Sequence, residues 1–285
     1  MSSIVQMTRR VTFSSGHRYW LPALSPEENR AKFGRWASPF NHGHNYVLDV
    51  TVEGPVGPED GMVVNIKRVD DALRSRVLAE FDQRSINDEI PYFANRAPSV
   101  ENLLGYIADR LGGSMLSVSR DVGGQTDAAV KLTALRLEET PLFYGELDMS
   151  TRSVSLTRIY EFAAAHRLNS SQLSDEENVR RYGKCNHPQG HGHNYVLEVT
   201  VGGEPDPETG MMVSLDALDE TVTAEILDRY DHRNLDVDVE ELQGKVTTSE
   251  VVSLAIFDRL KTKMPDHLRR IRLWETARNM FEVSA

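Results

Sequence analysis

The chain of 285 residues contains one cysteine, Cys185, so no disulfide can form within it and nothing indicates an oxidising compartment. It also has no run of about 18 consecutive apolar residues, the length that a membrane-spanning helix needs. Its first ten residues, Met1 to Arg10, lack the apolar core of a secretion signal. These absences predict a cytoplasmic protein with no membrane partner.

Basic residues are fewer than acidic residues in this chain. The chain carries 32 Lys and Arg against 43 Asp and Glu, a formal net charge of −11. Proteins that bind nucleic acid present a dense basic surface to the phosphates. The composition therefore argues against a nucleic-acid partner, and an anionic small substrate would need a local basic pocket.

The most informative feature that is present is a duplicated string, His-Gly-His-Asn-Tyr, at 42–46 and 191–195. A third histidine precedes each copy at the same distance, so His17 joins the first copy and His166 the second. Six of the nine histidines fall in these two sets. Their recurrence at fixed spacing points to metal chemistry.

The repeat extends over the whole chain at a shift of 149 residues, which predicts two domains, 1–148 and 152–285, joined by a short connection near Leu147 to Ser153. The first copy has 13 extra residues around Gly112 to Thr126, a stretch rich in Gly and Ser that predicts a lengthened loop.

Each copy has the same pattern of elements. Apolar residues alternate with polar ones over Tyr46 to Val52 and over Tyr195 to Val201, which predicts half-buried strands. Asn65 and Ser214 stand where a helix N-cap belongs. The remaining expected elements are helices over Ser99 to Leu111 and Ser249 to Leu260, a strand over Tyr160 to His166, and paired strands over 131–137 and 142–147 and over 270–274 and 279–283. Two strands, two helices and two strands in each copy predict an α+β fold with an antiparallel sheet.

The histidine pattern suits a catalytic metal. Residues two apart on a strand face the same side, so His42 with His44, and His191 with His193, can reach one ion. Three imidazoles leave one coordination position open, as in catalytic rather than structural zinc sites. Zn²⁺ is the metal expected from the ligand type, with iron and nickel as alternatives. A single His-x-His could equally be a solvated strand face, but the recurrence of all three positions argues against that interpretation.

Further motifs complete a resemblance. The second half contains Phe162-Ala163-Ala164-Ala165-His166, Tyr182-Gly183-Lys184-Cys185-Asn186-His187, Asp231-His232-Arg233-Asn234-Leu235, Thr248-Ser249-Glu250 and Trp274-Glu275-Thr276. Together with the histidine string these resemble the 6-pyruvoyltetrahydropterin synthase family, over essentially all of 155–285 and, with departures, over the first half. The resemblance implies two tandem tunnelling-fold domains, each an antiparallel four-stranded sheet with two helices on one face.

The resemblance also implies roles and an activity. His166, His191 and His193 would hold zinc, Cys185 would transfer protons with support from Asp231 and His232, and Glu275 would anchor the pterin ring, aided by Glu250 and Thr248. A thiol becomes a useful base when a nearby imidazole and carboxylate stabilise its thiolate. The implied reaction converts 7,8-dihydroneopterin triphosphate to 6-pyruvoyltetrahydropterin with loss of triphosphate, that of a carbon–oxygen lyase acting on phosphates.

Structural interpretations of the same residues stay open. A lone cysteine is often a small buried apolar residue, the Asp231-His232 pair could cap a helix end, and Glu275 could be an exposed strand charge. The basic residues Arg180, Arg181 and Lys184 could form a solvated face or contact a triphosphate.

The first half departs from the pattern at two positions. Trp36 stands where the second half has Cys185, and Gln83 where it has His232. Tryptophan cannot act as a base. His17, His42, His44, Glu101 and Glu139 remain, so we expect this half to keep a metal site and pterin contacts without the elimination chemistry, as a scaffold, a regulatory pocket or a site for another reaction such as epimerisation or aldol cleavage.

The resemblance implies trimeric rings stacked in pairs with sites at subunit boundaries. If Cys185 meets an Asp-His pair from a neighbouring copy, a mixed ring would place it beside Gln83, so we expect a homotrimer with two stacked like-with-like rings. Two alternative functions remain: a 6-carboxytetrahydropterin synthase of queuosine precursor synthesis, and a pterin- or metal-binding protein without turnover. The spacing between Cys185 and His191 favours the pyruvoyl enzyme.

Overall fold

The computed structural model describes residues 4–58, 60–112 and 130–285. The expected lengthened loop lies outside these residues from position 113 onwards. Among the described residues, no helix is both long enough and apolar enough to cross a membrane.

The two halves of the chain contain helices and strands in nearly the same order. The first repeat contains β1 (Ile4–His17), α1 (Pro26–Phe33), η1 (Gly34–Trp36), β2 (His42–Pro55), α2 (Ile66–Leu73), η2 (Arg74–Leu78), α3 (Ala79–Phe81), β3 (Arg84–Ser85), α4 (Ile86–Glu89), η3 (Pro91–Phe93), α5 (Val100–Gly112), β4 (Lys131–Thr140) and β5 (Phe143–Asp148). The second contains β6 (Val154–His166), α6 (Asp175–Tyr182), η4 (Gly183–Asn186), β7 (His191–Gly202), α7 (Leu215–Val222), η5 (Thr223–Leu227), α8 (Asp228–Tyr230), β8 (Arg233–Asn234), η6 (Glu240–Leu242), α9 (Ser249–Lys263), β9 (Leu268–Thr276) and β10 (Asn279–Ser284). The predicted strands and long helices are all present, most of them longer than expected.

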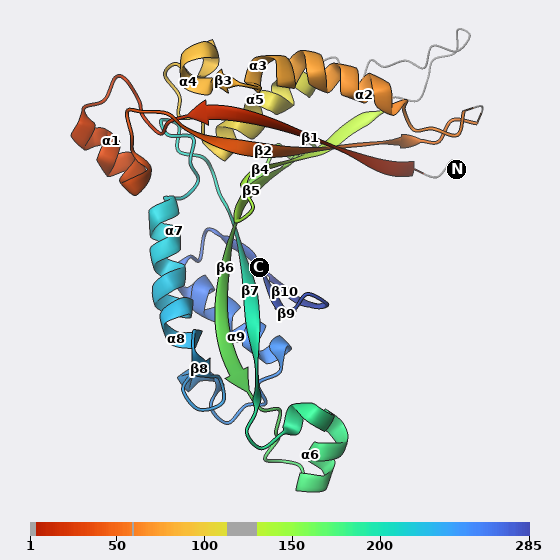
Figure 1. Cartoon of the computed structure of the whole chain (residues 1–285), viewed down its shortest axis with the longest axis vertical. Coiled ribbons are helices and arrows are strands. Elements are labelled where there is room, and N and C mark those ends of the chain that lie inside the picture. Colours follow the sequence, from red (N-terminus) through yellow and green to blue (C-terminus); the bar gives the residue numbers. More distant parts are fainter. Residues whose placement is uncertain (1–3, 59, 113–129) are drawn as a thin grey trace. The chain divides into compact units, whose positions relative to one another are not determined.

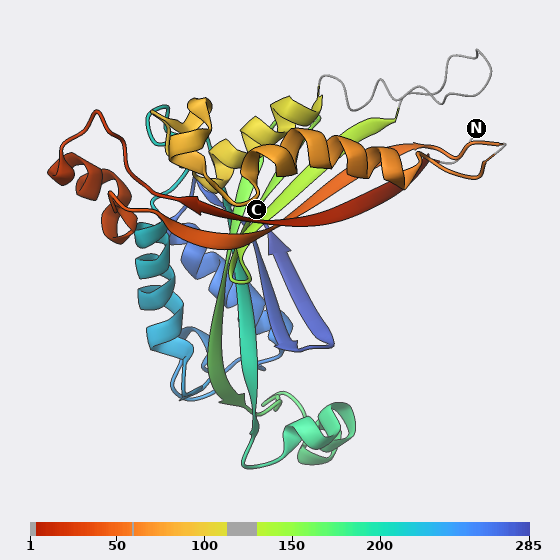
Figure 2. The same cartoon turned by 45° about the horizontal axis from the view of Figure 1, so that its top comes forward.

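The sheet agrees with the expected α+β class. In the first repeat β2 pairs antiparallel with β1 and β4, and β4 pairs antiparallel with β5. In the second repeat β9 pairs antiparallel with β7 and β10. In both views of the chain, α2 and α5 lie over the same face of the first-repeat strands (Figures 1 and 2).

The expected four-stranded sheet in each half is not confirmed. Each repeat adds a two-residue strand that runs parallel to its first strand, β3 on β1 and β8 on β6. The hydrogen-bonded order of the described strands is β10-β9-β7-β6-β5-β4-β2-β1-β3, a ten-stranded sheet with β8 beside β6. The connection between β5 and β6 is a tight turn in which the Asp148 N–H donates to the Ser153 carbonyl, 3.0 Å. Because the connection is this short, β5 and β6 follow one another in the order.

The described residues group into two compact units. Unit 1 contains Met1–Leu156 together with Gly203–Ser214, and unit 2 contains Thr157–Gly202 and Leu215–Ala285. The domain boundaries inferred from the repeat, 1–148 and 152–285, remain a prediction. One segment of the second repeat, the connection from β7 to α7, thus belongs to unit 1.

The predicted alternation on the second strand of each repeat is confirmed. Tyr46, Leu48, Val50 and Val52 are buried, and so are their equivalents on β7. They share the core of their own repeat with buried residues of the helices, Leu73, Val77, Leu104 and Ile107 in the first repeat and Leu218, Val222, Ile226 and Ile256 in the second. Burial of the apolar face holds helices and sheet together.

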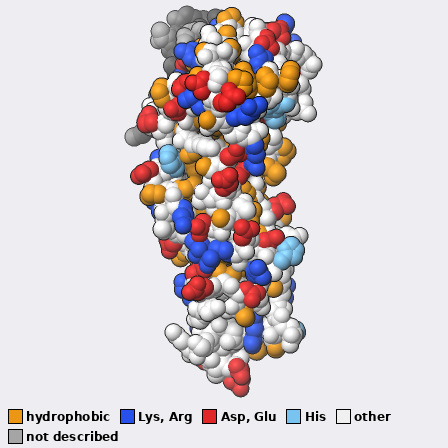
Figure 3. All heavy atoms as spheres, turned by 90° about the vertical axis from the view of Figure 1, so that its left-hand side faces the viewer, with side chains coloured by type: hydrophobic (Ala, Val, Ile, Leu, Met, Phe, Trp, Pro, Cys, Tyr) orange, Lys and Arg blue, Asp and Glu red, His pale blue; other side chains and the backbone are white. Residues whose placement is uncertain are grey.

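Equivalent ion pairs tie a helix to the first strand of each repeat. The Arg9 guanidinium donates to both carboxylate oxygens of Asp70 on α2, at 2.5 and 3.0 Å. Arg158 does the same to Asp219 on α7, at 3.1 and 2.7 Å. Such two-point pairs fix direction as well as distance. Acidic and basic side chains are also interspersed over the face drawn in Figure 3.

A core substitution tests this packing. Leu48 has no exposed surface, whereas Leu142 in the β4–β5 turn is 51% exposed. We expect Leu48→Ala to lower the free energy of unfolding by about 2–5 kcal/mol because it leaves a cavity, measured by urea denaturation. The control Leu142→Ala should change it by no more than about 0.5 kcal/mol. Equal effects of the two substitutions would contradict the assignment of the core.

Candidate metal and catalytic site

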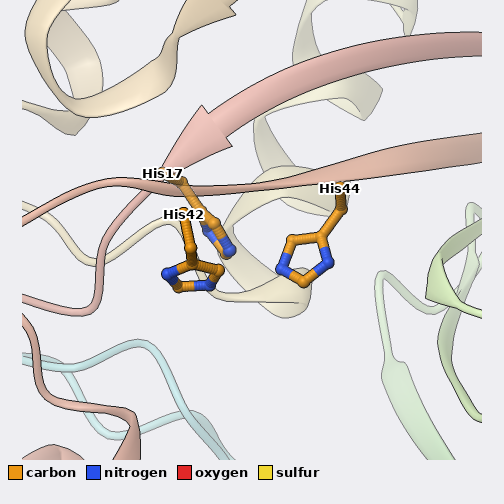
Figure 4. A group of neighbouring side chains, drawn as sticks. All are labelled: His17, His42 and His44. Carbon is orange, nitrogen blue, oxygen red and sulfur yellow. The ribbon is translucent and has the colours of Figure 1, made fainter.

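In the first repeat, strand pairing brings three histidines together. His17 ends β1 and lies opposite His42, the first residue of β2, and His44 follows two residues later on the same strand. Their ring centroids are 4.6 to 5.1 Å apart, and one nitrogen of each lies within 4.8 Å of the others. Figure 4 shows the three rings directed toward a common space.

The second repeat builds the same cluster. His166 ends β6, and His191 and His193 begin β7, the next strand in the sheet. The centroids are 4.7 to 5.3 Å apart, and the ligand nitrogens again lie within 4.8 Å of one another. Either cluster could therefore hold one metal ion.

The hydrogen bonds of the buried histidines fit metal binding. The Nδ1 atom of His17 lies 3.2 Å from the Pro98 carbonyl oxygen, and that of His166 lies 2.7 Å from the Thr247 carbonyl oxygen. Within the described residues, the buried Nε2 atoms of His17, His44, His166 and His193 have no hydrogen-bond partner. A carbonyl that accepts from Nδ1–H leaves the Nε2 lone pair for an ion, as in known metal sites.

The rings of the first cluster are held in the neutral, metal-binding form. Burial, followed by the charges of His42 and His44, lowers the pKa of His17 to about 3. Burial and then His42 lower the pKa of His44 to about 4. Burial also lowers the pKa of His191 and His193. Neutral imidazoles need not lose a proton before they bind a metal.

One carboxylate lies beside each cluster. Glu139 approaches Nε2 of His44 and His17 at 3.7 and 4.0 Å, and Glu275 approaches Nε2 of His166 and His193 at 3.8 and 3.9 Å. Ser249 Oγ–H donates to Glu275 Oε1 at 2.7 Å. Burial acts to raise the pKa of Glu275, but the hydrogen bonds from Ser249 and Asn279 outweigh it and the pKa is lowered. Glu275 is thus an ionised acceptor next to the candidate metal position, not an exposed strand charge.

A short helix that sequence reasoning missed positions Cys185. Helix α6 begins with a capping box in which Ser174 and Glu177 bond reciprocally, and Ser25 and Glu28 do the same at α1. The Ser-x-x-Glu spacing could have revealed both helices. The 3₁₀ turns η4 and η1 follow directly and carry Cys185 and its counterpart Trp36.

The side chains of Asp231 and His232 pair with one another. Asp231 accepts the Ala163 backbone N–H at 2.8 Å, and its other oxygen lies 2.9 Å from His232 Nδ1. The hydrogen bonds from Ala163 and then from His232 lower the pKa of Asp231. His232 has a φ of 56°, and Gln83 at the equivalent position has 60°. The unusual backbone is therefore common to both repeats, and only the side chain at that position differs.

Equivalent residues line a cavity in each repeat. The second-repeat cavity, about 590 Å³, is bordered by Gly192, His193 and His232 among others, and the first-repeat cavity, about 410 Å³, by Gly43, His44 and Gln83. A cluster histidine and the His232 position thus share one cavity. Lys184 and Asn186, the neighbours of Cys185, line a different cavity with Arg167 and His187, of about 620 Å³.

The structure does not bring every predicted catalytic residue together. Within the described part of the chain, Cys185 Sγ makes no hydrogen bond, and His232 pairs with Asp231 rather than with the thiol. The His232 side chain is 82% exposed. The described residues of one chain therefore do not form a Cys–His–Asp arrangement.

The remaining predicted substrate-binding residues differ between the repeats. Glu101 is buried and accepts the Met212 backbone N–H at 2.9 Å. Glu250, at the equivalent position on α9, is exposed, and Thr248 precedes α9 as its N-cap residue. Burial raises the pKa of Glu101 to about 7 despite the hydrogen bond from Met212.

Comparison with known proteins identifies the family. The model of the family described as 6-pyruvoyl tetrahydropterin synthase matches residues 6–148 and again 155–285. The chain belongs to the 6-pyruvoyl tetrahydropterin synthase family. The two matches confirm both the resemblance and the tandem duplication, and the relatives indicate an α+β fold of the tunnelling class.

Individual relatives match about one repeat. A putative 6-pyruvoyl tetrahydrobiopterin synthase of Caenorhabditis elegans is 46% identical over 130 residues, 45% of this chain and 92% of its own length. The structure of the C. elegans 6-pyruvoyl tetrahydropterin synthase is 44% identical, covers 47% of this chain and 96% of that one, and has a TM-score of 0.45. A 6-carboxy-5,6,7,8-tetrahydropterin synthase of Rickettsia bellii is 26% identical over 123 residues, 38% of this chain and 80% of its own.

The two clusters predict two metal ions per chain. We expect the protein, loaded with Zn²⁺ and desalted, to contain two equivalents by elemental analysis, and His17→Ala or His166→Ala each to lose one. The matched control is His187→Ala, which removes a histidine outside both clusters. Retention of both ions by His166→Ala would contradict the ligand assignment.

Glu101 gives a pH dependence of stability with a defined sign. Its pKa is about 7 in the folded chain against a reference value of 4.5, so the folded state holds a proton that the unfolded state releases between these values. Wild-type stability should therefore fall as pH rises from about 4.5 to 7. Glu101→Gln should become more stable relative to wild type over that window, at about 1.4 kcal/mol per unit of pKa difference. Denaturation at several pH values tests this, with Glu250→Gln as the exposed control.

Proposed function

We propose that the second repeat is a zinc-dependent 6-pyruvoyltetrahydropterin synthase that acts on 7,8-dihydroneopterin triphosphate and releases triphosphate. The observation that carries the proposal is the combination, in this repeat alone, of a histidine cluster with a thiol and an Asp-bound imidazole. The names of the relatives support the reaction, and the ligand type supports zinc.

Zinc, when bound by His166, His191 and His193, would lower the pKa of a substrate hydroxyl and polarise a carbonyl. The chain's own residues then bind and move protons. Glu275, ionised and fixed by Ser249, would accept a pterin ring N–H and the adjacent amine together. This would hold the substrate side chain next to the histidine cluster.

Proton transfer is the role proposed for Cys185. The thiolate would take a proton from a side-chain carbon next to the hydroxyl, and the resulting thiol would return a proton as the internal redox change proceeds, so no redox cofactor is consumed. His232, oriented by Asp231, would stabilise the thiolate. Cys185 and His232 are not in contact within one chain, so this role requires a second copy, as in the expected homotrimer of stacked like-with-like rings.

The first repeat is proposed to bind metal without this reaction. Its histidine cluster, Glu139 and the backbone around Gln83 match the second repeat, but Trp36 and Gln83 supply neither a thiol nor an imidazole. It would serve as a scaffold or a regulatory pterin site.

A thiol substitution tests the proposal. We expect Cys185→Ala to lower kcat by about 10²–10⁴, the range for a lost general acid–base group, in an assay of triphosphate release from 7,8-dihydroneopterin triphosphate. The variant should keep its zinc content, because Cys185 is not in the histidine cluster. Trp36→Ala, the same truncation at the equivalent first-repeat position, is the control and should keep most of the turnover.

Substantial turnover by Cys185→Ala would reject the proposed base. Mass spectrometry of the wild-type product separates the two enzymatic alternatives, because a 6-pyruvoyl product supports the proposal and a 6-carboxy product with acetaldehyde supports the queuosine-pathway reaction. Absence of any triphosphate release would favour a non-catalytic pterin- or metal-binding protein.

A further inference from the structure

A cavity of about 620 Å³ lies beside Cys185 in the second repeat and is lined by two cationic side chains. Helix α6 and the turn η4, which connect the end of β6 to the start of β7, provide much of its lining (Figure 1). Arg167 follows β6 directly, and Lys184 lies on η4. Cys185 is the residue between two lining residues, Lys184 and Asn186. The volume is in the range of small-molecule sites, about 300–1,000 Å³.

The Arg167 guanidinium is held in place but not neutralised. Its Nε–H donates to the Asn186 carbonyl at 3.0 Å, and its Nη2 lies 3.4 Å from Asn186 Oδ1. Within residues 4–58, 60–112 and 130–285, neither Arg167 nor Lys184 forms an ion pair, and Asp175, the one carboxylate of the lining, is exposed. An oriented guanidinium and an ammonium group without a counter-ion in a cavity are suited to an anion.

The equivalent arginine of the first repeat already has a carboxylate. Arg18 donates to both carboxylate oxygens of Asp88, at 2.8 and 2.6 Å. It also donates to Asn41 Oδ1 at 2.8 Å. At the repeat shift of 149 residues, Val237 stands at the position of the aspartate and Gly190 at that of the asparagine. The second repeat therefore lacks both side chains that occupy the arginine in the first.

The backbone around the two arginines is the same. The Arg18 N–H donates to Asn87 Oδ1 at 2.9 Å, and the Arg167 N–H donates to Asp236 Oδ2 at 2.6 Å. The next residue along the chain is the aspartate partner in the first repeat and Val237 in the second. Val237 is 64% exposed, so a carboxylate at this position would displace no core residue and would reach Arg167 as it reaches the first-repeat arginine.

We propose that this cavity binds the phosphate groups of a polyphosphate anion through Arg167 and Lys184, with His187 as a further donor. Arginine offers paired N–H groups to phosphate oxygens, and lysine adds a point charge. His187 Nδ1 accepts the Gln189 backbone N–H at 3.2 Å, which leaves Nε2 to donate. We expect one such anion per chain, because Arg18 is already paired.

The proposed function supplies one source of this anion, the triphosphate of 7,8-dihydroneopterin triphosphate. That identification rests on the proposed function, whereas polyphosphate binding by the cavity does not. Bound here, the triphosphate would lie next to Cys185. Of the basic residues that the sequence suggested for a triphosphate contact, Lys184 lines the cavity, whereas Arg180 and Arg181 are exposed on α6 and do not.

Calorimetric titration of the zinc-loaded protein with inorganic tripolyphosphate tests the site without turnover. We expect Val237→Asp to weaken binding at least about tenfold, because the new carboxylate pairs with Arg167. Val237→Asn has nearly the same shape without the charge and is the matched control, which should bind as wild type does. Arg167→Gln should also weaken binding about tenfold, whereas Arg18→Gln should not. Circular dichroism and elemental analysis establish that each variant is folded and contains zinc.

A second background separates the cavity from the histidine cluster, since tripolyphosphate can also coordinate zinc. In His166→Ala, the difference in affinity between Val237→Asp and Val237→Asn should persist. The proposal is overturned if wild type does not bind tripolyphosphate, if the two Val237 variants bind it equally, or if Arg18→Gln weakens binding as much as Arg167→Gln does.

Steady-state kinetics of triphosphate release identifies the source of the anion. If the cavity holds the substrate's triphosphate, Val237→Asp should raise KM relative to Val237→Asn and leave kcat nearly unchanged. Tripolyphosphate should then compete with the substrate. Weakened tripolyphosphate binding with an unchanged KM would instead show that the cavity takes a free polyphosphate. Absence of triphosphate release by wild type would reject the proposed function and leave the binding result standing.

Discussion

The site in each repeat depends on the placement of two strand ends beside one another. His17 at the end of β1 lies directly opposite His42 at the start of β2, and His44 follows on the same face. The antiparallel register is set by the buried alternation from Tyr46 to Val52, because a slip of one residue would turn that whole apolar set toward water. The core that stabilises the sheet therefore also fixes the geometry of the histidine cluster.

Residues outside the two strands supply the hydrogen-bond acceptors and the carboxylate that surround the histidine cluster. Carbonyl groups at Pro98 and Thr247 accept from the buried histidines and so direct the free Nε2 atoms inward. Both carbonyls lie in the segment just before a long helix, α5 or α9. One carboxylate in each repeat, Glu139 on β4 or Glu275 on β9, reaches the same space. The histidines, the carbonyl groups that accept from them and the neighbouring carboxylate thus come from separate segments that the fold brings together.

Comparison of the repeats separates framework from chemistry. The Asp82 and Asp231 carboxylates each accept a backbone N–H from the first strand, and the next residue adopts a positive φ in both. On this common framework the side chain is Gln83 in one repeat and His232 in the other. Both repeats therefore share the scaffold and the histidine cluster, whereas the side chains proposed for proton transfer differ. This difference is the basis for proposing turnover in the second repeat.

The sequence by itself determined the duplication, the strands with their buried faces, the long helices and the histidine clusters, because each leaves a local or periodic pattern. Helices α1 and α6 had a readable capping signal that was missed. Only the tertiary structure decided that Cys185 and His232 do not pair within the described residues of one chain, that Glu101 is buried while Glu250 is exposed, and that Gly203–Ser214 belongs to unit 1. These depend on which distant segments meet. The repeat places a glutamate at both positions, and its burial in one repeat comes from a segment more than 100 residues away.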